Sequence, residues 1–288
     1  FEVAALPLQP TKTPARRYQP GAGGMAFNAA IAAARLGATV RLVGRVGCEP
    51  EVRRLRDRLR DEGIEDRALL AVPGASTSVS AIVVDAHGER QIFNHRGDAI
   101  ARGPALDEQV LHGADVVLAD PRWVAGADRA LRWARAQRVI SVLDGDVAPR
   151  RDLQQLVPLA RWVVFSEPGL AAFVPELDAP QALARALAVG CDCAMVTRGE
   201  REVLWRRRGG ALQTAAVPQV AAVDTTGAGD VFHAALGIAL AEGRGDVEAV
   251  AFAAMAASLK CLQGPGVLGA PRRAAVDKAL RQPAPIAA

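Results

Sequence analysis

The most informative stretch of the chain reads Asp224-Thr-Thr-Gly-Ala-Gly-Asp230 and runs directly into the apolar residues 231–236. Small residues let the backbone curl so that successive N–H groups point into one concavity, and a following helix adds its positive N-terminal end. The stretch therefore predicts an anion site in front of a helix. The amides expected to form this site belong to Gly227, Ala228 and Gly229.

Asp230 is the last residue of this stretch and lies at the N-terminus of the expected helix. We expect the positive end of the helix dipole to keep the Asp230 carboxylate ionised. Phosphoryl transfer needs hydrogen-bond donors that stabilise the charge on the transferred phosphoryl group and a carboxylate that accepts the hydroxyl proton. Asp230 is thus a candidate general base. The alternative is that Asp230 is only a helix N-cap and that the glycines form a plain turn.

Around this stretch, apolar runs of strand length alternate with helical patterns, which is typical of a parallel sheet covered on both faces. The strand candidates are residues 39–43, 115–119, 139–143, 162–165, 194–197 and 211–217. The helix candidates are residues 26–36, 50–62, 125–137, 180–189, 231–241, 247–262 and 271–280. We expect a doubly wound α/β fold with a mostly parallel sheet.

Two segments break the alternation. Residues 1–20 are rich in Pro and polar side chains, and residues 76–100 contain two further strand candidates, 79–84 and 90–93. We expect these segments to form a small β lid over the substrate, with residues 21–75 and 101–288 as the core. Exposed strand edges tend to be covered by pairing, so we also predict a homodimer joined through the lids.

The composition excludes several classes of protein. The 35 Lys and Arg residues against 31 Asp and Glu residues are interspersed, which argues against nucleic-acid binding. The longest uncharged apolar helix candidate, residues 249–259, falls short of the about 20 residues that a membrane span needs. The start of the chain lacks the pattern of a signal peptide, so we expect a cytoplasmic protein. The four His residues share no ligand spacing, which argues against zinc.

The seven-residue stretch resembles, position by position, the C-terminal signature of the ribokinase-like (phosphofructokinase-B type) carbohydrate kinases. The resemblance extends to Gly23-Gly-Met-Ala-Phe-Asn-Ala-Ala30 and to Val196-Thr-Arg-Gly199. It implies the ribokinase-like fold, with ATP across the C-terminal half and a sugar between core and lid. It implies Asp230 as the catalytic base. It implies sugar contacts from Gly23, Gly24, Asn28 and Asp230. It implies nucleotide contacts from Thr197, Gly199, Thr226, Gly227, Gly229, Ser258 and Gly264.

The chain departs from the family pattern in the segment that organises the metal ion in most members. Ser166-Glu-Pro-Gly169 stands where most members carry an Asn and a Glu that organise Mg²⁺ through water, so Glu167 is the candidate for the water shell of the metal. ATP and Mg²⁺ are the implied cofactors, and a monovalent cation near the Asp224 loop is left open. The first strand of the family, whose terminal Asp grips sugar hydroxyls, would precede Phe1.

Within the family, the chain resembles most the branch that contains the bacterial sulfofructose kinases. The stretches that carry this resemblance are Asp115-Val-Val-Leu-Ala-Asp-Pro-Arg-Trp123, Ser141-Val-Leu-Asp-Gly-Asp146, Phe165-Ser-Glu-Pro-Gly-Leu170 and residues 223–233. In that branch a Lys, an Asn and an Arg hold the sulfonate, and Lys12, Asn94 and Arg122 occupy the matching places. Arg offers a planar fork to such an anion and Lys a point charge.

The resemblance therefore predicts transfer of the ATP γ-phosphate to a primary hydroxyl of a ketose-like, anionic sugar, namely 6-deoxy-6-sulfofructose to its 1-phosphate. The alternatives are a ketohexokinase-like enzyme for another ketohexose or a sugar acid, and a non-catalytic sugar or nucleotide sensor on the same fold. A dinucleotide loop at Gly21-Ala-Gly-Gly24 is disfavoured, because a polar stretch rather than a strand precedes it.

Overall fold

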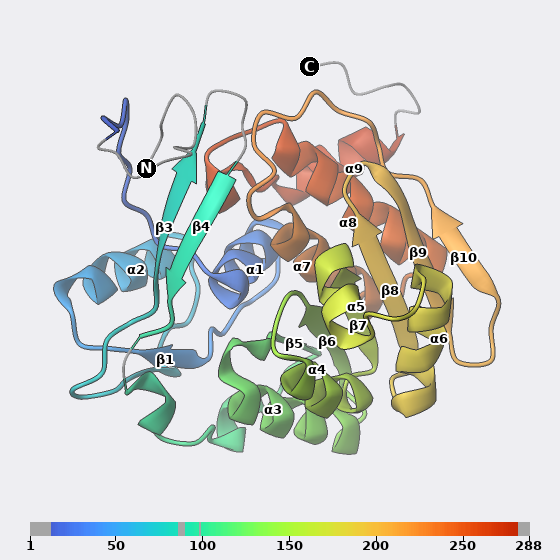
Figure 1. Ribbon diagram of the computed structural model, residues 1–288, viewed down its shortest axis with the longest axis horizontal. Helices are drawn as coiled ribbons and strands as arrows, with labels where there is room; N and C mark the ends of the chain where they lie inside the picture. Colours follow the sequence, from blue (N-terminus) through green and yellow to red (C-terminus); the bar gives the residue numbers. More distant parts are fainter. Residues whose placement is uncertain (1–12, 86–89, 98, 282–288) are drawn as a thin grey trace.

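A six-stranded sheet forms the centre of the computed structural model, which describes residues 13–85, 90–97 and 99–281 (Figure 1). The strands lie in the order β10-β9-β8-β7-β6-β5. They are β5 (Val116–Ala119), β6 (Ile140–Gly145), β7 (Trp162–Ser166), β8 (Cys193–Arg198), β9 (Arg201–Arg207) and β10 (Leu212–Ala215). Strands β5 to β8 are parallel, whereas β9 and β10 extend the sheet in antiparallel fashion. The predicted mostly parallel sheet is confirmed.

Helices cover both faces of this sheet (Figure 1). One face packs against α1 (Met25–Arg35), α7 (Ala228–Ala241) and α8 (Asp246–Cys261), with α2 (Pro50–Asp61) and α9 (Arg273–Arg281) joining the same core. The other face packs against α3 (Val124–Ala136), α4 (Arg150–Leu156), α5 (Glu167–Phe173) and α6 (Ala179–Val189). None of the helices in the described part of the chain has the length and apolar character that crossing a membrane requires.

Strand β7 shows why the central strands are apolar without interruption. Its side chains alternate between the two faces, so Trp162 and Val164 belong to the core beneath α7 and α8. Val163 and Phe165 belong to the core beneath α4 to α6. Because both faces are covered, residues 162–165 are all buried, and these four positions show no alternation with polar residues.

Two small sheets stand beside the main one. β1 (Gly44–Val46) and β2 (Leu69–Ala71) are parallel, and β3 (Val79–Val84) and β4 (Arg90–His95) form an antiparallel hairpin that stands apart from the main sheet (Figure 1). The hairpin strands expected at 79–84 and 90–93 are therefore present. Residues 1–12 of the predicted lid lie outside the described residues, and residues 13–20 are exposed and belong to neither strand.

Some elements differ from the sequence-based expectation. The strand expected at residues 39–43 is wrong: this segment forms only an isolated bridge, from Arg41 to Glu65, and the regular strand β1 begins at Gly44. Strand β9 and helix α5 were not expected from the sequence. Helix α5 forms because the Ser166 side chain accepts a hydrogen bond from the Gly169 N–H and Pro168 occupies its first turn.

Candidate active site

The backbone turns sharply where α7 begins. Gly227 precedes the helix with a φ of 83°, a left-handed conformation that glycine adopts without a Cβ penalty. The Ala228 N–H donates to Thr225 O at 3.2 Å, and the Val231 N–H donates to Gly227 O at 3.0 Å. The N–H groups of the two residues between them, Gly229 and Asp230, precede the first intrahelical bond, so helix geometry leaves them open for an anion.

This geometry corrects two expectations. The amide of Ala228 was predicted to contribute to the anion site, but the turn itself uses it. The alternative reading of Asp230 as an N-cap is wrong, because the cap is Gly227 and Asp230 lies inside the first turn of α7. The open amides therefore lie one residue further into the helix than the sequence suggested.

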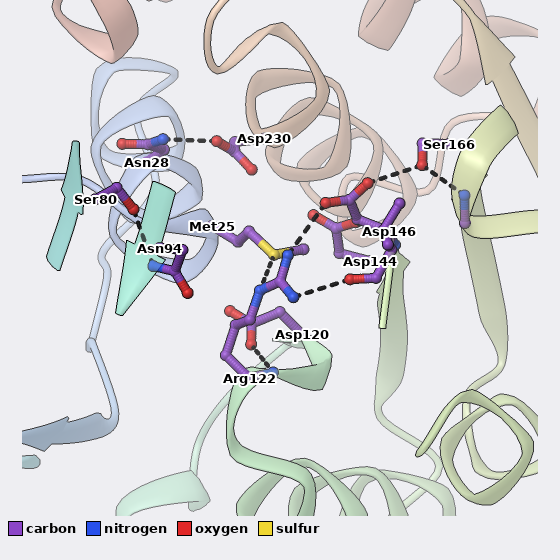
Figure 2. A network of polar contacts seen from close by, with 12 residues as sticks. Met25, Asn28, Ser80, Asn94, Asp120, Arg122, Asp144, Asp146, Ser166 and Asp230 are labelled. Atoms are coloured by element: carbon purple, nitrogen blue, oxygen red, sulfur yellow. Dashed lines mark hydrogen bonds and ion pairs between the residues drawn. The ribbon is translucent and has the colours of Figure 1, made fainter. Parts of the chain in front are cut away.

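The carboxylate of Asp230 faces helix α1. Asn28 Nδ2 donates to Asp230 Oδ2 at 2.7 Å (Figure 2). The Asn28 N–H in turn donates to Gly24 O at 2.8 Å, and Gly24 caps α1 with a φ of 112°. The structure thus brings the predicted sugar-binding motif and the predicted base into direct contact.

Burial raises the pKa of Asp230 to about 7, and the neighbouring carboxylate of Asp144 acts in the same direction. The hydrogen bond from Asn28 and the nearby ring of His233 act in the opposite direction. Burial therefore outweighs the groups that favour the ionised form of Asp230. A pKa near neutrality suits a group that accepts a proton during catalysis.

Further carboxylates lie at the carboxyl ends of β5 and β6, where parallel sheets usually bind their ligands. Asp120 Oδ1 accepts from the Arg122 N–H at 2.7 Å and its Oδ2 from the Ala26 N–H at 3.1 Å, and burial raises its pKa. Asp144 is mostly buried, and its Oδ1 accepts from the Asp146 N–H at 3.1 Å. Burial, followed by the charges of Asp146 and Asp120, raises the pKa of Asp144 well above its usual range.

His233 links the turn at the start of α7 to the sheet. Its Nδ1 lies 2.5 Å from Gly229 O, and its Nε2 lies 3.1 Å from Val164 O and 3.4 Å from Asp144 Oδ1. Gly229 O belongs to the same peptide unit as the Asp230 N–H, so His233 also fixes the direction of that open amide.

Arg122 lies at the same edge of the sheet (Figure 2). Its Nη2 is 3.2 Å from Asp146 Oδ2, its Nη1 donates to Val147 O at 2.9 Å, and its Nε is 3.1 Å from the Met25 sulfur. Ser166 Oγ donates to the other oxygen of Asp146 at 2.8 Å. The Arg122 side chain remains 40% exposed, so a ligand can reach it from solvent.

Asp146 lies beside the segment where the family pattern has its metal-organising residues. A Cβ at Gly169 would be 1.9 Å from Gly145 O, so only glycine permits this close approach of β6 to α5. Glu167, the predicted metal residue, is instead in an ion pair with Arg201. The sequence leaves open whether Asp144 and Asp146, at the end of β6, contact ATP or Mg²⁺ or only satisfy loop amides. In the structure the Asp146 carboxylate contacts Ser166 and Arg122, beside this segment.

The residues predicted to contact the nucleotide lie in different parts of the structure, and one of them is buried. Thr197 is the next-to-last residue of β8, and its hydroxyl donates to Phe165 O at 3.3 Å. Gly199 turns into β9 with a φ of 65°. Thr226 and Gly264 lie around Asp224, next to the catalytic turn. Ser258, in contrast, is buried and its hydroxyl donates to Pro218 O at 3.0 Å. Its side chain is therefore engaged within the protein rather than directed at a nucleotide.

The residues predicted to hold a sulfonate are placed in part. Asn94 lies on β4, opposite Ser80 in the hairpin, and its Nδ2 donates to Ser80 Oγ at 2.9 Å (Figure 2). Arg122 lies at the sheet edge described above. Lys12 lies outside the described residues. The side chains of Asn94 and Arg122 already make hydrogen bonds within the protein. An anionic ligand would have to replace these bonds or add to them.

The sequence profile described as pfkB family carbohydrate kinase matches residues 3–271. The chain belongs to the pfkB family of carbohydrate kinases. Members of this family are sugar kinases, so the carboxylate and the open amides of the α7 turn lie in an enzyme that transfers a phosphoryl group to a sugar.

Relatives within the pfkB family agree with this assignment. The chain is 31% identical over 268 residues to a ribokinase of Bacillus subtilis (strain 168), a match that covers 91% of this chain and 89% of the relative. It is 31% identical over 231 residues to a fructokinase of Klebsiella pneumoniae, with 74% and 75% covered. A solved structure of a putative ribokinase from Agrobacterium tumefaciens is similar, with a TM-score of 0.92 and 34% identity over 98% of this chain and 93% of that one.

Proposed function

We propose that the protein transfers the γ-phosphate of ATP to a primary hydroxyl of a ketose-like sugar, with Asp230 as the general base. The observation that carries this proposal is the carboxylate of Asp230, held by Asn28 at 2.7 Å beside the open amides of the α7 turn. A cytoplasmic location is part of the proposal, because ATP is the phosphoryl donor.

The sugar oxygen attacks the γ-phosphorus, and the bond from that phosphorus to the oxygen bridging it to the β-phosphate breaks, which releases ADP. The hydroxyl proton passes to the carboxylate of Asp230. The N–H groups of Gly229 and Asp230 stabilise the negative charge that builds on the transferred group. Thr197, Gly199 and Thr226 are proposed to line the nucleotide side of the site.

The residues present fit a Mg²⁺ ion held by the nucleotide. The described residues include no group of three or more His, Cys, Asp or Glu side chains that could hold a metal ion by themselves. Mg²⁺ in kinases is usually held by substrate phosphates, waters and one or two carboxylates, where it neutralises phosphate charge. We propose that Asp146 supplies such a carboxylate through water, with Glu167 doing so only if it leaves Arg201.

For the sugar, we propose 6-deoxy-6-sulfofructose and its 1-phosphate. The half-exposed guanidinium of Arg122 supports an anionic head group, because a sulfonate can take the place that Asp146 holds at 3.2 Å. Another ketohexose or a sugar acid is the alternative, favoured by the similarity to a fructokinase. Only a charged head group makes Arg122 important for specificity.

Replacing Asp230 tests the reaction itself. Asp230→Asn keeps the shape of the side chain but cannot accept the proton, so we expect kcat to fall by roughly 10²–10⁴-fold while ATP binding persists. ADP release with Mg-ATP and calorimetric titration of ATP measure the two effects. Near-normal turnover in this variant would refute the assignment of the base.

A substrate screen tests the sugar. We expect ADP release with sulfofructose to exceed that with fructose and with sugar acids, and Arg122→Gln to lower kcat/KM for sulfofructose more than for fructose. Arg151→Gln is a matched control, because that side chain is 87% exposed and pairs with Asp152. Activity on neutral ketohexoses alone would contradict the sulfonate proposal.

We also propose that the β3–β4 hairpin is a lid that joins two subunits. Side chains alternate along a strand, so Val79 and Phe93 lie on the face opposite to Asn94. Val79 is 62% exposed and Phe93 is 57% exposed, and such apolar side chains favour a partner surface. Sedimentation of the intact protein tests this, and a monomer mass at every concentration would exclude the dimer.

A further inference from the structure

Lys260 is a buried lysine that the proposed reaction does not use. Its side chain is 0% exposed, in the last turn of α8. Its ammonium group donates to Asp224 O and lies 3.5 Å from Asp224 Oδ2. A buried charge is strongly unfavourable unless it is paired and hydrogen-bonded, so Lys260 and Asp224 form a unit.

Asp224 connects three segments around the catalytic turn. Its Oδ1 accepts from the Thr226 N–H at 2.8 Å, and its Oδ2 accepts from the Gly266 N–H at 2.6 Å. Burial acts to raise the pKa of Asp224, but these two N–H groups and the charge of Lys260 together lower it below its usual value. The side chain is therefore a carboxylate, and its negative charge is fixed close to Gly227.

The end of α8 adds further negative potential at this point. Cys261 O accepts from the Val223 N–H at 2.8 Å and from the Asp224 N–H at 3.3 Å. The C-terminal end of a helix carries a partial negative charge, to which a lysine in the last turn is complementary. The carboxylate and the backbone carbonyl of Asp224 thus meet at the ammonium of Lys260, which comes from the last turn of α8.

We infer that Lys260 is a built-in cation that positions the phosphate-binding turn, and that the enzyme therefore needs no monovalent metal ion at the Asp224 loop. A metal ion there would require the same oxygen atoms, because hard cations bind carbonyl and carboxylate oxygens. Lys260 acts through Asp224, which stands three residues before Gly227, and it touches no substrate. This inference rests on the proposed function.

The first test uses the wild-type enzyme. Its kcat is measured in KCl, NaCl and NH4Cl against tetramethylammonium chloride, whose cation is too large for such a site, at constant ionic strength. We expect the same kcat in all four salts. Activation by K⁺ or NH₄⁺ relative to tetramethylammonium would overturn the inference.

The second test removes the ammonium. In Lys260→Ala we expect kcat to fall on the order of tenfold or more in tetramethylammonium chloride, because a hydrogen bond from a charged group to the Asp224 loop is lost. K⁺, NH₄⁺ or methylammonium should restore part of the rate by entering the space beside Asp224. Lys278→Ala, an exposed lysine of α9, is the control and should show neither effect. A folded Lys260→Ala enzyme that no small cation activates would contradict the inference.

A third measurement does not depend on turnover. K⁺ should raise the thermal unfolding midpoint of Lys260→Ala relative to tetramethylammonium, but leave that of the wild type unchanged. This measurement tests the role of Lys260 separately from the proposed kinase function, because the expected shift in the unfolding midpoint does not require that any sugar is phosphorylated. An equal response of both proteins to K⁺ would count against a built-in cation. If Lys260→Ala does not fold, the wild-type salt series decides.

Discussion

Asn28 Nδ2 lies 2.7 Å from Asp230 Oδ2, although 202 positions separate the two residues in the chain. The contact joins the second turn of α1 to the first turn of α7 (Figure 2). Because Asn28 donates to the ionised form of the carboxylate, it favours that form against the effect of burial. The side chain that is expected to touch the sugar thus also adjusts the base.

Removal of this hydrogen bond should change the pH dependence of the reaction. In Asn28→Ala the pKa of Asp230 should rise, because the donor that lowers it is gone. A hydrogen bond to a charged group is worth roughly 1.5–3 kcal/mol, so the acid limb of the kcat profile should move up by about one to two pH units. An acid limb that stays in place would show that Asn28 contacts the sugar only.

Removal of a neighbouring charge should have the opposite effect. The rate of the wild type should fall as the pH drops below about 7, where Asp230 becomes protonated. Asp144 raises the pKa of Asp230, so Asp144→Asn should move this limb to lower pH. Asp57→Asn, at an exposed position of α2, is the matched control. A shift to higher pH in Asp144→Asn would contradict the coupling between the two carboxylates.

The same substitution should change stability with a defined sign. The folded-state pKa of Asp144 is raised, so its contribution to stability is complete below the unfolded pKa of about 4 and is lost as the pH rises through the folded value. Asn cannot ionise and keeps the acceptor for the Asp146 N–H. The stability of Asp144→Asn relative to the wild type should therefore increase from pH 5 to pH 8 in urea unfolding, and a decrease would contradict the raised pKa.

His233→Gln should lower kcat by changing the turn at the start of α7 and the pKa of Asp230. Glutamine can still donate to one carbonyl, but it removes the charge that lowers the pKa of Asp230. We expect kcat to fall and the acid limb to move to higher pH, whereas a purely structural role would lower kcat equally at every pH. His112→Gln, an exposed position, serves as the control. A proportional loss at all pH values would limit His233 to packing.

Arg138 offers a test of backbone strain. It follows helix α3 with a φ of 60°, and the bonds from the Arg138 N–H to Arg135 O and from the Val139 N–H to Ala134 O are those of a helix end that usually carries glycine. Arg138→Gly should stabilise the protein by about 1 kcal/mol, or roughly 2–4 °C in the unfolding midpoint. Gln137→Gly, one position earlier at a helical φ of −85°, should instead destabilise it. A lower midpoint for Arg138→Gly would show that its side chain matters more than the strain.

The sequence indicated the main features of the fold because burial on both faces leaves a clear pattern. Strands β5 to β8 read as continuous apolar runs, and their expected positions are confirmed. Strand β9 was missed because charged residues occupy both of its ends, from Arg201 to Arg207. Helix α5 was missed because Pro168 and Gly169 read as a loop, although Pro in a first helical turn is favourable.

The site could be predicted only where its residues are adjacent in the chain. The small residues before Asp230 indicated the turn, and the resemblance of residues 224–230 to the family signature made Asp230 the candidate base. The raised pKa of Asp144, the contacts of His233 and the ammonium of Lys260 depend on how α7 and α8 lie on the sheet. Carboxylates at the ends of successive strands were a usable signal for Asp120 and Asp146, because those ends meet at one edge.

The close approach between Gly169 and Gly145 O has a consequence for variation in this chain. Any larger side chain at 169 would drive the β6 end outward, away from α5, and would take Asp146 out of reach of Ser166. An Asn and Glu pair as most family members have it could not be restored here by exchanging Ser166 and Gly169 alone. The loop after β6 would have to be redesigned at the same time.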